Sequence, residues 1–465
     1  MKRAILITAV LSSGVFAQPP EERIRELEER IRALQQEVRS LKEGQKETEV
    51  IKEEVRKLRL EISMPQIDIK SYSGLGPAAS KVHFNPKGVS LGGYGELTFR
   101  RNDVNARGGA KNIANAQRII LYFGYAFDEK LKFNSELELE HASTSAEHGT
   151  GGGYFKAELA YLDYQFRPEF GLRGGLLLMP VGIVNEVHEP PTFPSAERPF
   201  FERRIALSTW EEMGVGVYGE VGPVDYRFYV INGLMLKGAG SYNREEPLKN
   251  LRQRGARAVA ERVGYTGRVD VELPLKVKVG ASFLHADVQS KGCSTQGSAC
   301  ADSAYGFRRG TKVGSVSMFL PHAWYQHAGW DIRFVGAYIT TQDAHKMSQD
   351  LRGTSGITTD LSRVDTVIPK EQTGYYLQVA YDVFRLYGKD DQELYLFGIY
   401  EDFDTHRKVP QGYKKPDGHK LKVYNAGVSY KPHPLVAIKA DYAKLDYSKP
   451  KKDENEYRFT LGFMF

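Results

Sequence analysis

From residue 89 to the end of the chain, short segments of alternating apolar and polar residues are joined by connections that are alternately very short and long. A period of two is typical of β-strands with one apolar and one polar face. An up-and-down antiparallel barrel, with turns at one rim and loops at the other, produces this alternation of connections, whereas a sandwich or a propeller does not require it. Sixteen segments fit the pattern: 89–101, 117–127, 130–141, 154–167, 170–179, 213–221, 224–234, 264–273, 275–287, 316–327, 330–341, 374–385, 392–403, 421–431, 435–446 and 456–465.

The two faces of these segments differ in chemistry. Ile119, Leu121, Phe123 and Phe127 share one face of their segment, while Arg118 occupies the other. A water-filled lumen solvates such charged side chains and lipid does not. A mean hydropathy of -0.44 argues against a bundle of membrane-spanning helices, and 27 Tyr, 23 Phe and 46 Gly suit extensive β structure. We therefore predict an all-β transmembrane barrel of about 16 antiparallel strands over residues 89–465.

The first seventeen residues have the features of a secretory signal peptide. Lys2 and Arg3 precede a short apolar run, and Val15 and Ala17 provide small residues before a cleavage site. The run is too short to span a membrane, which requires about 20 residues. Residues 1–17 are therefore expected to be removed after export.

Residues 18–62 are expected to form a coiled coil that precedes the barrel. The aliphatic residues recur with alternating spacings of three and four: Ile24, Leu27, Ile31, Leu34, Val38 and Leu41. The register slips near Gly44, so the coil is broken or flexible in its middle. A single amphipathic helix folded onto the rest of the chain is the alternative. Residues 63–88 contain Pro65, Gly74 and Pro86 and are expected to form a linker to the barrel.

One long connection, 179–212, differs from the others because it is rich in proline and aromatic residues. Apolar loop residues are costly in water, so we expect this loop to fold against the inner wall and to narrow a lumen that sixteen strands leave too wide for side chains to fill. Its candidate selectivity residues are Arg198, Arg203, Arg204, Glu202 and His188. The arginines could hold a permeating phosphate or carboxylate, or they could pair with nearby glutamates and merely fix the loop.

Further basic residues are predicted to face the lumen, although acidic residues are interspersed with them and no ladder of one sign results. These basic residues are Arg100, Arg118, Arg173, Arg227, Arg268, Lys276, Lys278 and Arg333. Such a mixture suits a general pore as well as an anion pore.

The sequence offers no recognisable catalytic or metal-binding motif. Cys293 and Cys300 lack zinc-site spacing, and after export they would form a loop disulfide or remain free thiols. HExxH and P-loop patterns are missing from the sequence. We therefore expect no enzymatic activity, no cofactor, no metal and no nucleic-acid partner.

The chain resembles the phosphate-selective porin family of Gram-negative outer membranes. The resemblance rests on the overall organisation and on "LRGGLLLMPVG" followed by "RPFFER", in which Pro180, Gly182 and Phe201-Glu202-Arg203 match the family pattern. It implies a homotrimer in outer-membrane lipid, a periplasmic coiled coil and diffusion of small anionic or neutral solutes. An alternative function is a structural tether or spacer that uses the coiled coil.

The last strand also resembles a known signal, that for outer-membrane assembly. In "EYRFTLGFMF" the terminal Phe465 is preceded by Phe463 and Leu461 at every second position. The resemblance implies recognition by the barrel-assembly machinery.

Overall fold

The computed structural model describes residues 29–33, 35–36, 70–104, 111–144, 153–237, 242–292, 309–353, 366–388 and 391–465. The chain divides into two compact units, Met1–Ile67 and Asp68–Phe465. In the first unit the described residues are helical. The predicted signal peptide, most of the predicted coiled coil and both cysteines, Cys293 and Cys300, lie outside the described residues.

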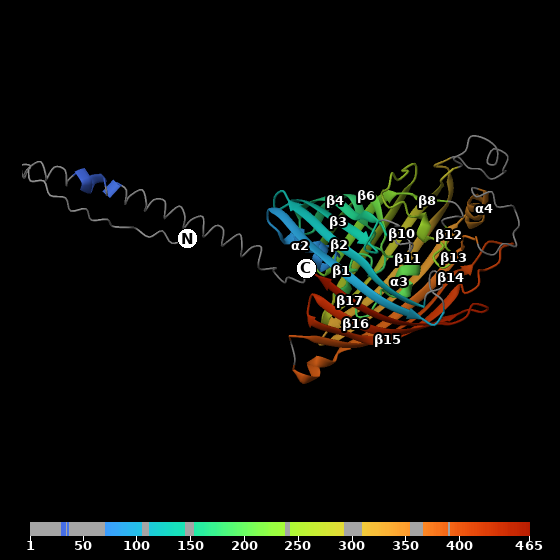
Figure 1. Ribbon diagram of the computed structural model, residues 1–465. Helices are drawn as coiled ribbons and strands as arrows, with labels where there is room; N and C mark the ends of the chain where they lie inside the picture. Colours follow the sequence, from blue (N-terminus) through green and yellow to red (C-terminus); the bar gives the residue numbers. More distant parts are fainter. Residues whose placement is uncertain are drawn as a thin grey trace, which may run out of the picture. The chain divides into compact units, whose positions relative to one another are not determined.

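In the second unit, sixteen strands form a closed antiparallel barrel (Figure 1), which confirms the predicted fold class. The ring consists of β1 (Gly88–Asn102), β2 (Asn112–Ala126), β3 (Leu131–Glu140), β4 (Phe155–Arg167), β5 (Phe170–Leu178), β6 (Glu211–Val221), β7 (Val224–Asn232), β9 (Val263–Leu273), β10 (Val277–Ser290), β11 (Lys312–His327), β12 (Trp330–Gln342), β13 (Glu371–Asp382), β14 (Glu393–Lys408), β15 (Lys420–His433), β16 (Val436–Tyr447) and β17 (Glu454–Met464). The three-residue β8 (Leu234–Leu236) adds in parallel to the end of β10 and stands outside the ring.

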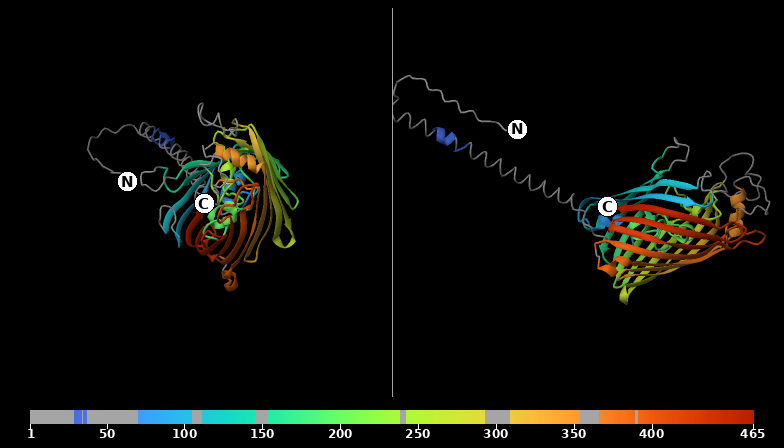
Figure 2. Two further views of the ribbon diagram at one scale, coloured as in Figure 1. Left: turned by 90° about the vertical axis from the view of Figure 1, so that its right-hand side faces the viewer. Right: turned by 60° about the horizontal axis from the view of Figure 1, so that its bottom comes forward.

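The short and long connections lie at opposite rims, as predicted (Figure 2). Residues 168–169, 222–223 and 328–329 are two-residue turns, and Gly222 and Gly329 adopt positive φ angles of 59° and 84° that favour glycine. Two other tight connections contain the 3₁₀ turns η5 (Pro274–Lys276) and η6 (Val383–Tyr387). The longer connections carry η4 (Lys249–Leu251) and α4 (Ala344–Gly353). None of the helices in the described part of the chain is long and apolar enough to cross a membrane.

The prediction that Lys276 faces the lumen is wrong. Lys276 ends η5, and its side chain is 65% exposed. Leu275 and Lys276 both have positive φ, so the chain reverses direction here and the strand alternation that would point Lys276 inward does not apply. Lys278 lies two residues further on, within β10, and is partly buried.

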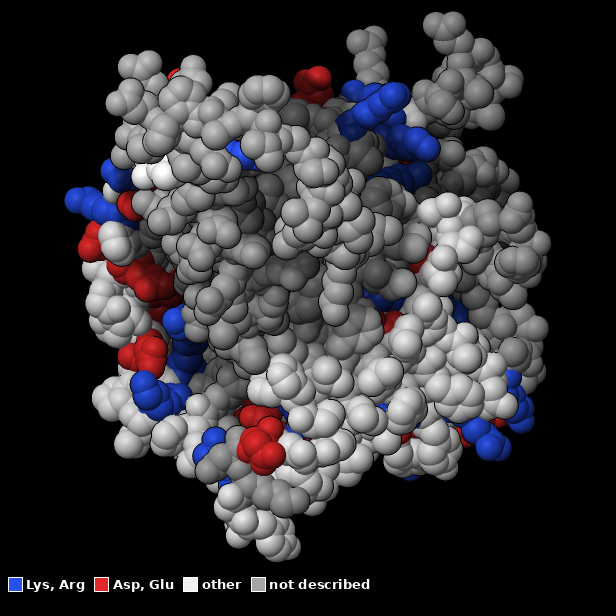
Figure 3. Space-filling view, turned by 60° about the vertical axis from the view of Figure 1, so that its left-hand side comes forward, with Lys and Arg blue, Asp and Glu red and all other residues white. Residues whose placement is uncertain are grey.

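The outer face of the barrel is apolar and exposed, whereas the inner face is buried. Along β2, Ile119, Leu121 and Phe123 are exposed, while Ile120 and Tyr122 between them are buried. Figure 3, in which the side bearing α2 comes forward, shows basic and acidic side chains interspersed over the coloured part of the surface. The described barrel therefore has its apolar surface around the strands and charges of both signs on the side that Figure 3 shows.

Two inserts occupy the interior of the barrel: the helix α2 (Pro77–Phe84) and the connection between β5 and β6. The inner wall packs around α2, because Asn134 of β3 donates to the carbonyl of Ala79 at 2.8 Å and Val82 is buried beside Gly124. A Cβ at position 124 would lie 2.5 Å from Val82 Cβ, so glycine permits this close approach. The structure differs from the linker expected over 63–88, because Pro77 starts the helix α2 there. The apolar residues Ala78, Ala79 and Val82 of this helix are buried in the barrel unit.

The carboxyl terminus closes the ring. β17 pairs with β1 from Tyr94↔Met464 to Asn102↔Glu456, and Phe465 exchanges two backbone hydrogen bonds with Gly93 at 2.9 and 3.0 Å. The Phe463 ring lies so close to Gly95 that a Cβ there would be 2.4 Å from it. Because every strand of the ring has two partners, no edge is left unpaired.

Deleting Phe465 is expected to lower the yield of assembled barrel several-fold, because the deletion removes the last backbone pair of the closing strand and the ring that covers Gly93. The heat-dependent shift of gel mobility in isolated membranes measures the assembled fraction. As a control, Phe228→Ala removes an exposed aromatic of β7 without touching the closure. An unchanged assembled fraction in the deletion variant would contradict this role of the last residue.

Candidate functional site

The connection between β5 and β6, residues 179–210, is the candidate functional site, and we call it the inward loop. Its ends are held together by Asn185, whose side chain donates to the carbonyls of Met179 at 2.6 Å and Trp210 at 3.0 Å and accepts from the Trp210 N–H at 2.7 Å. The turn into the loop requires Gly182, which has a φ of 70° and whose Cβ would lie 2.6 Å from a carboxylate oxygen of Glu202. The loop therefore leaves the wall through a fixed neck.

The inward loop reaches the opposite wall (Figure 2). Glu401 of β14 accepts hydrogen bonds from the backbone N–H groups of Phe200 and Phe201 at 3.1 and 2.5 Å, at the start of α3 (Phe200–Arg204). β14 is eight positions from β5 in the ring order β5-β6-β7-β9-β10-β11-β12-β13-β14. Since eight positions are half of a sixteen-stranded ring, the loop crosses the lumen.

Other strands of the far wall hold the polypeptide between the neck and α3. Lys439 of β16 donates to the carbonyls of Pro190 at 2.5 Å and Ser195 at 3.0 Å, and Asp441 accepts from the Ala196 N–H at 2.8 Å. Arg333 of β12 donates to the carbonyl of Thr192 at 2.7 Å. These charged side chains satisfy backbone groups that would otherwise be buried without partners.

The candidate selectivity residues of the loop do not converge on one point. Arg203 pairs with Glu197 at 2.8 Å, and Arg204 pairs with Glu245 at 2.8 Å. Arg198 is buried, and its Nη2 has no hydrogen-bond partner among the described residues. Arg203 thus pairs with a glutamate of the loop, as the alternative interpretation of the sequence expected, whereas Arg204 pairs with a glutamate of the next long connection.

Among the described residues Glu202 forms no ion pair with these arginines, and it contacts the loop neck and β13 instead. It accepts from the Ile183 N–H at 3.4 Å and from the Tyr376 hydroxyl at 3.1 Å. Burial raises the pKa of Glu202 to about 7, although these two hydrogen bonds oppose the increase. Near neutral pH this carboxyl group is therefore poised between its neutral and charged forms.

Four of the basic residues predicted to face the lumen are buried in ion pairs with the wall or the loop. Arg173 pairs with Asp163 at 2.7 Å and Arg333 pairs with Asp331 at 2.6 Å. A larger group of ion pairs joins β7, β9 and the loop: Arg227 with Glu186 at 3.1 Å, with Asp270 at 3.0 Å and with Asp225, and Arg268 with Asp270 at 2.8 Å and Glu186 at 3.7 Å. Buried charges need such partners, so these arginines stabilise the packed interior.

A second group of arginines lies around Glu197 of the loop. It consists of Arg100, Arg118, Arg203 and Arg458, and we call it the arginine cluster. The cluster surrounds Glu197, which lies 2.8 Å from Arg203 and 3.9 Å from Arg100. Burial alone would raise the pKa of Glu197, but the arginine cluster more than offsets burial and lowers it to about 2. The side chains of Arg100 and Arg203 are 33% and 28% exposed, so they face space inside the barrel.

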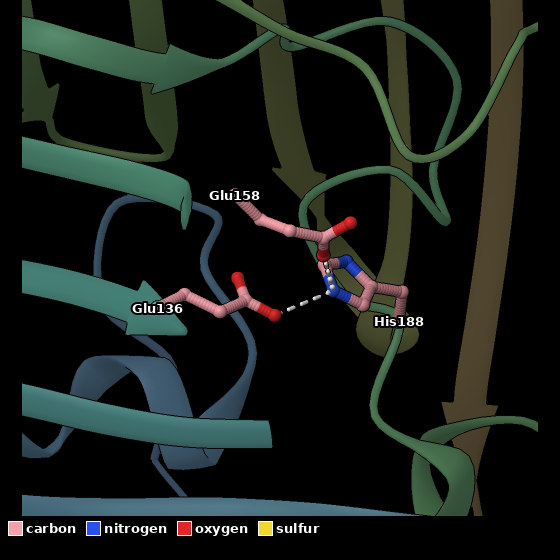
Figure 4. Close-up of side chains that lie close together, drawn as sticks. All are labelled: Glu136, Glu158 and His188. Atoms are coloured by element: carbon pink, nitrogen blue, oxygen red, sulfur yellow. Dashed lines mark hydrogen bonds and ion pairs between the residues drawn. The ribbon is translucent and has the colours of Figure 1, made fainter. Parts of the chain in front are cut away.

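His188 lies between two fully buried carboxylates, Glu136 of β3 and Glu158 of β4 (Figure 4). Its Nε2 is 3.3 Å from Glu136 Oε1 and 3.5 Å from Glu158 Oε2, and its Nδ1 is 2.8 Å from the carbonyl of Asn185. Burial would lower the pKa of His188, but the two carboxylates offset this effect and raise it to about 10. This cluster fastens the loop to the wall near its neck.

A cavity of about 470 Å³ lies at the rim with the short turns. It is bounded by Pro77 of α2, by Val187 and Pro191 of the loop, and by Trp324 and Asp331 of the wall. The inward loop and α2 therefore leave an open space on this side of the interior.

Sequence reasoning did not identify Glu401, Asn185 or Glu158, and it placed Glu136 only among the acids that face the lumen. A signal for Glu401 was present, because Phe397, Ile399, Glu401 and Phe403 share one face and Leu396 lies on the other. A strand that is apolar on both faces must be covered on its inner side as well. Phe201 covers it here, with its ring centroid 6.5 Å from that of Phe403.

Comparison of the sequence with known proteins finds a relative that matches along its whole length. A protein of Aquifex aeolicus (strain VF5), described as uncharacterized, is 50% identical over 465 residues and is covered over 100% of both chains. No family model matches the sequence.

Solved structures similar to this chain include two outer-membrane proteins and a porin. A loop-deletion mutant of OmpT from Vibrio cholerae has a TM-score of 0.49 at 11% identity, with 82% of this chain and 100% of that chain covered. An anion-selective porin from Comamonas acidovorans has a TM-score of 0.49 at 11% identity, with 81% and 99% covered. The channel DcaP of Acinetobacter baumannii has a TM-score of 0.48 at 13% identity, with 81% and 97% covered.

The barrel is expected to lose stability as the pH rises through about 7, in part because of Glu202. The pKa of Glu202 is higher in the folded chain than its ordinary value of 4.5, so its stabilising contribution is complete below that value and is lost as the folded carboxyl group ionises. The difference amounts to about 3 kcal/mol. Thermal unfolding in detergent between pH 5 and pH 9 measures it. The Glu202→Gln variant, which cannot ionise, should show a smaller loss, and equal losses in both proteins would contradict the assignment.

Proposed function

We propose that this chain, which belongs to the same family as the Aquifex aeolicus protein, forms a channel in an outer membrane through which small hydrophilic solutes diffuse. The observation that carries the proposal is the closed sixteen-stranded barrel, whose outer face is apolar and whose inner face bears charged and polar side chains. A closed sheet leaves no unpaired backbone in lipid. Charged inner positions suit water and not hydrocarbon.

The proposed channel is narrow, because the inward loop and α2 occupy part of the interior. Apolar loop residues such as Val181, Phe201 and Ala206 are fully buried, which supports a loop packed between the walls. The cavity at the short-turn rim and the exposed side chains of Arg100 and Arg203 mark the space that remains. In this proposal the long loops face the outside and the short turns face the periplasm, as in barrels of this class.

The arginine cluster is the proposed origin of an anion preference. Guanidinium groups bind phosphate and carboxylate through forked hydrogen bonds. In the cluster, Nε and Nη2 of Arg203 and both Nη atoms of Arg458 have no hydrogen-bond partner among the described residues. Phosphate is one candidate solute, given the resemblance of the sequence to phosphate-selective porins.

Releasing the inward loop from the far wall should widen the channel. Glu401→Ala removes two hydrogen bonds from a carboxylate to backbone N–H groups, and charge-assisted bonds of this kind contribute about 1.5–3 kcal/mol each. We expect a larger single-channel conductance in planar bilayers than for the unaltered chain. Glu272→Ala, which changes a half-exposed carboxylate near the short turns, is the matched control. If Glu401→Ala and Glu272→Ala conduct alike, the loop does not set the width of the channel.

Removing charge from the arginine cluster should shift ion selectivity toward cations. The reversal potential in a KCl gradient, and in a gradient of potassium phosphate, measures the change for Arg100→Ala and Arg203→Ala. Arg167→Ala serves as the control, because this side chain is 73% exposed at a short turn. A cation-selective unaltered chain, or variants whose reversal potential matches that of Arg167→Ala, would rule out the proposed anion filter.

A further inference from the structure

The geometry points to a divalent metal site formed by Glu136, Glu158 and His188, with a transition-metal ion such as Zn²⁺ as its ligand. The three residues come from β3, β4 and the inward loop, and their side chains point toward one another (Figure 4). One ligand atom from each lies within 4.8 Å of the others, and all three side chains are buried. Carboxylate oxygens together with one imidazole nitrogen are a common ligand set for Zn²⁺.

The distances suit a shared ion better than direct hydrogen bonds. Charge-assisted hydrogen bonds between nitrogen and a carboxylate oxygen are about 2.7–2.9 Å long, whereas Nε2 of His188 lies 3.3 Å and 3.5 Å from the two carboxylates. Two ligand atoms that each lie about 2.1 Å from a tetrahedral ion are about 3.4 Å apart. The two distances from His188 Nε2 therefore match the spacing of ligands around one ion, and the ligand atoms of the two carboxylates lie within 4.8 Å of each other.

The backbone of the loop fixes the histidine tautomer that a metal requires. Nδ1 of His188 lies 2.8 Å from the carbonyl oxygen of Asn185, and a carbonyl oxygen can only accept, so Nδ1 donates. In the neutral ring the lone pair is then on Nε2, which faces Glu136 and Glu158. A second hydrogen bond of this kind is the usual support of a metal-binding histidine.

The carboxylates hold polar atoms that the described protein does not satisfy. Glu136 Oε2 and Glu158 Oε2 are buried without a hydrogen-bond partner among the described residues, and so is the hydroxyl of Tyr94, whose ring meets that of His188 edge-on at 5.9 Å. In this part of the chain Glu136 forms an ion pair only with His188. Lys156 offsets Glu158 at 2.7 Å, but it also pairs with Glu138 at 3.2 Å. A buried carboxylate with one shared cation partner gains from a second positive charge.

A second buried histidine in the interior lacks these features. His322 lies 2.6 Å from Asp270, but Arg268 and Arg227 already pair with that carboxylate at 2.8 and 3.0 Å. Two guanidinium groups repel an additional cation. His322 and Asp270 thus form a buried histidine–carboxylate pair that is not expected to bind metal, and they serve as a control for the proposed site.

A metal at this site would pin the inward loop to the wall near its neck, on the side opposite the Glu401 contacts. The competing occupant of Nε2 is a proton. Because metal binding displaces that proton, the affinity should fall as the pH is lowered.

Calorimetric titration of ZnCl₂ into the full chain, purified in detergent and treated with a chelator, tests the proposal. We expect one saturable Zn²⁺ per chain, and an affinity lower by at least about tenfold in His188→Gln and Glu158→Gln. His322→Gln should bind as the unaltered chain does. Addition of Co²⁺ should produce the absorption bands of a four-coordinate ion in the unaltered chain and not in His188→Gln.

Three results would overturn the metal assignment. The first is the absence of saturable Zn²⁺ uptake by the unaltered chain, which would leave the proton as the sole occupant of Nε2. The second is an equal Zn²⁺ affinity in His188→Gln and His322→Gln. The third is a Co²⁺ spectrum that His188→Gln does not change. The heat-dependent shift of gel mobility confirms that each variant forms a barrel. If His188→Gln does not form a barrel, Glu136→Gln, which keeps the shape of the side chain, replaces it in the titration. A lower Zn²⁺ affinity in Glu136→Gln would support the site, and an unchanged affinity would overturn it.

Discussion

The hydrogen-bonded closure of β17 onto β1 is the constraint from which the rest of the structure follows. Once Phe465 pairs with Gly93 and the ring is complete, every strand of the ring has two partners. A ring of sixteen strands encloses more space than its own side chains can fill. The interior must then hold water or additional polypeptide, and here α2 and the inward loop enter it. Their backbone groups need partners inside the barrel, which the wall supplies as charged side chains.

The charged side chains of the inner wall therefore have two roles, stabilising the loop and facing the solute path. Knowing which residues point inward does not separate these roles. Arg227, Arg268 and Glu186 are buried and paired, and they stabilise the contact between loop and wall. Arg100 and Arg203 remain partly exposed around Glu197, so they are the charges a solute would meet. The mixture of signs along the strands reflects this division, because buried arginines such as Arg173 and Arg227 are matched by acids of neighbouring strands or of the loop.

The barrel was predictable from the sequence because its signals are local. The period of two and the turn spacing identified all sixteen strands, and the Phe463 and Phe465 face is outward as expected. The features that were missed depend on register. Glu136, Glu158 and His188 meet only because β3 pairs with β4 and the loop returns to them, and spacing along the chain carries no trace of this. Lys276 was misplaced because positive φ angles at Leu275 and Lys276 delay the start of β10 to Val277. Residues 77–84 were expected to be a linker because helix formation there depends on burial in the barrel.

Swelling of liposomes that contain the full chain tests the central claim most directly, because it reports both whether solutes pass and how large they can be. A channel narrowed by the inward loop should admit small sugars and amino acids and exclude oligosaccharides that pass an unobstructed sixteen-stranded pore. The account would be contradicted if no solute produced swelling, which would mean that the loop and α2 close the barrel. Free passage of the larger oligosaccharides would contradict it equally, because the loop would then not narrow the path.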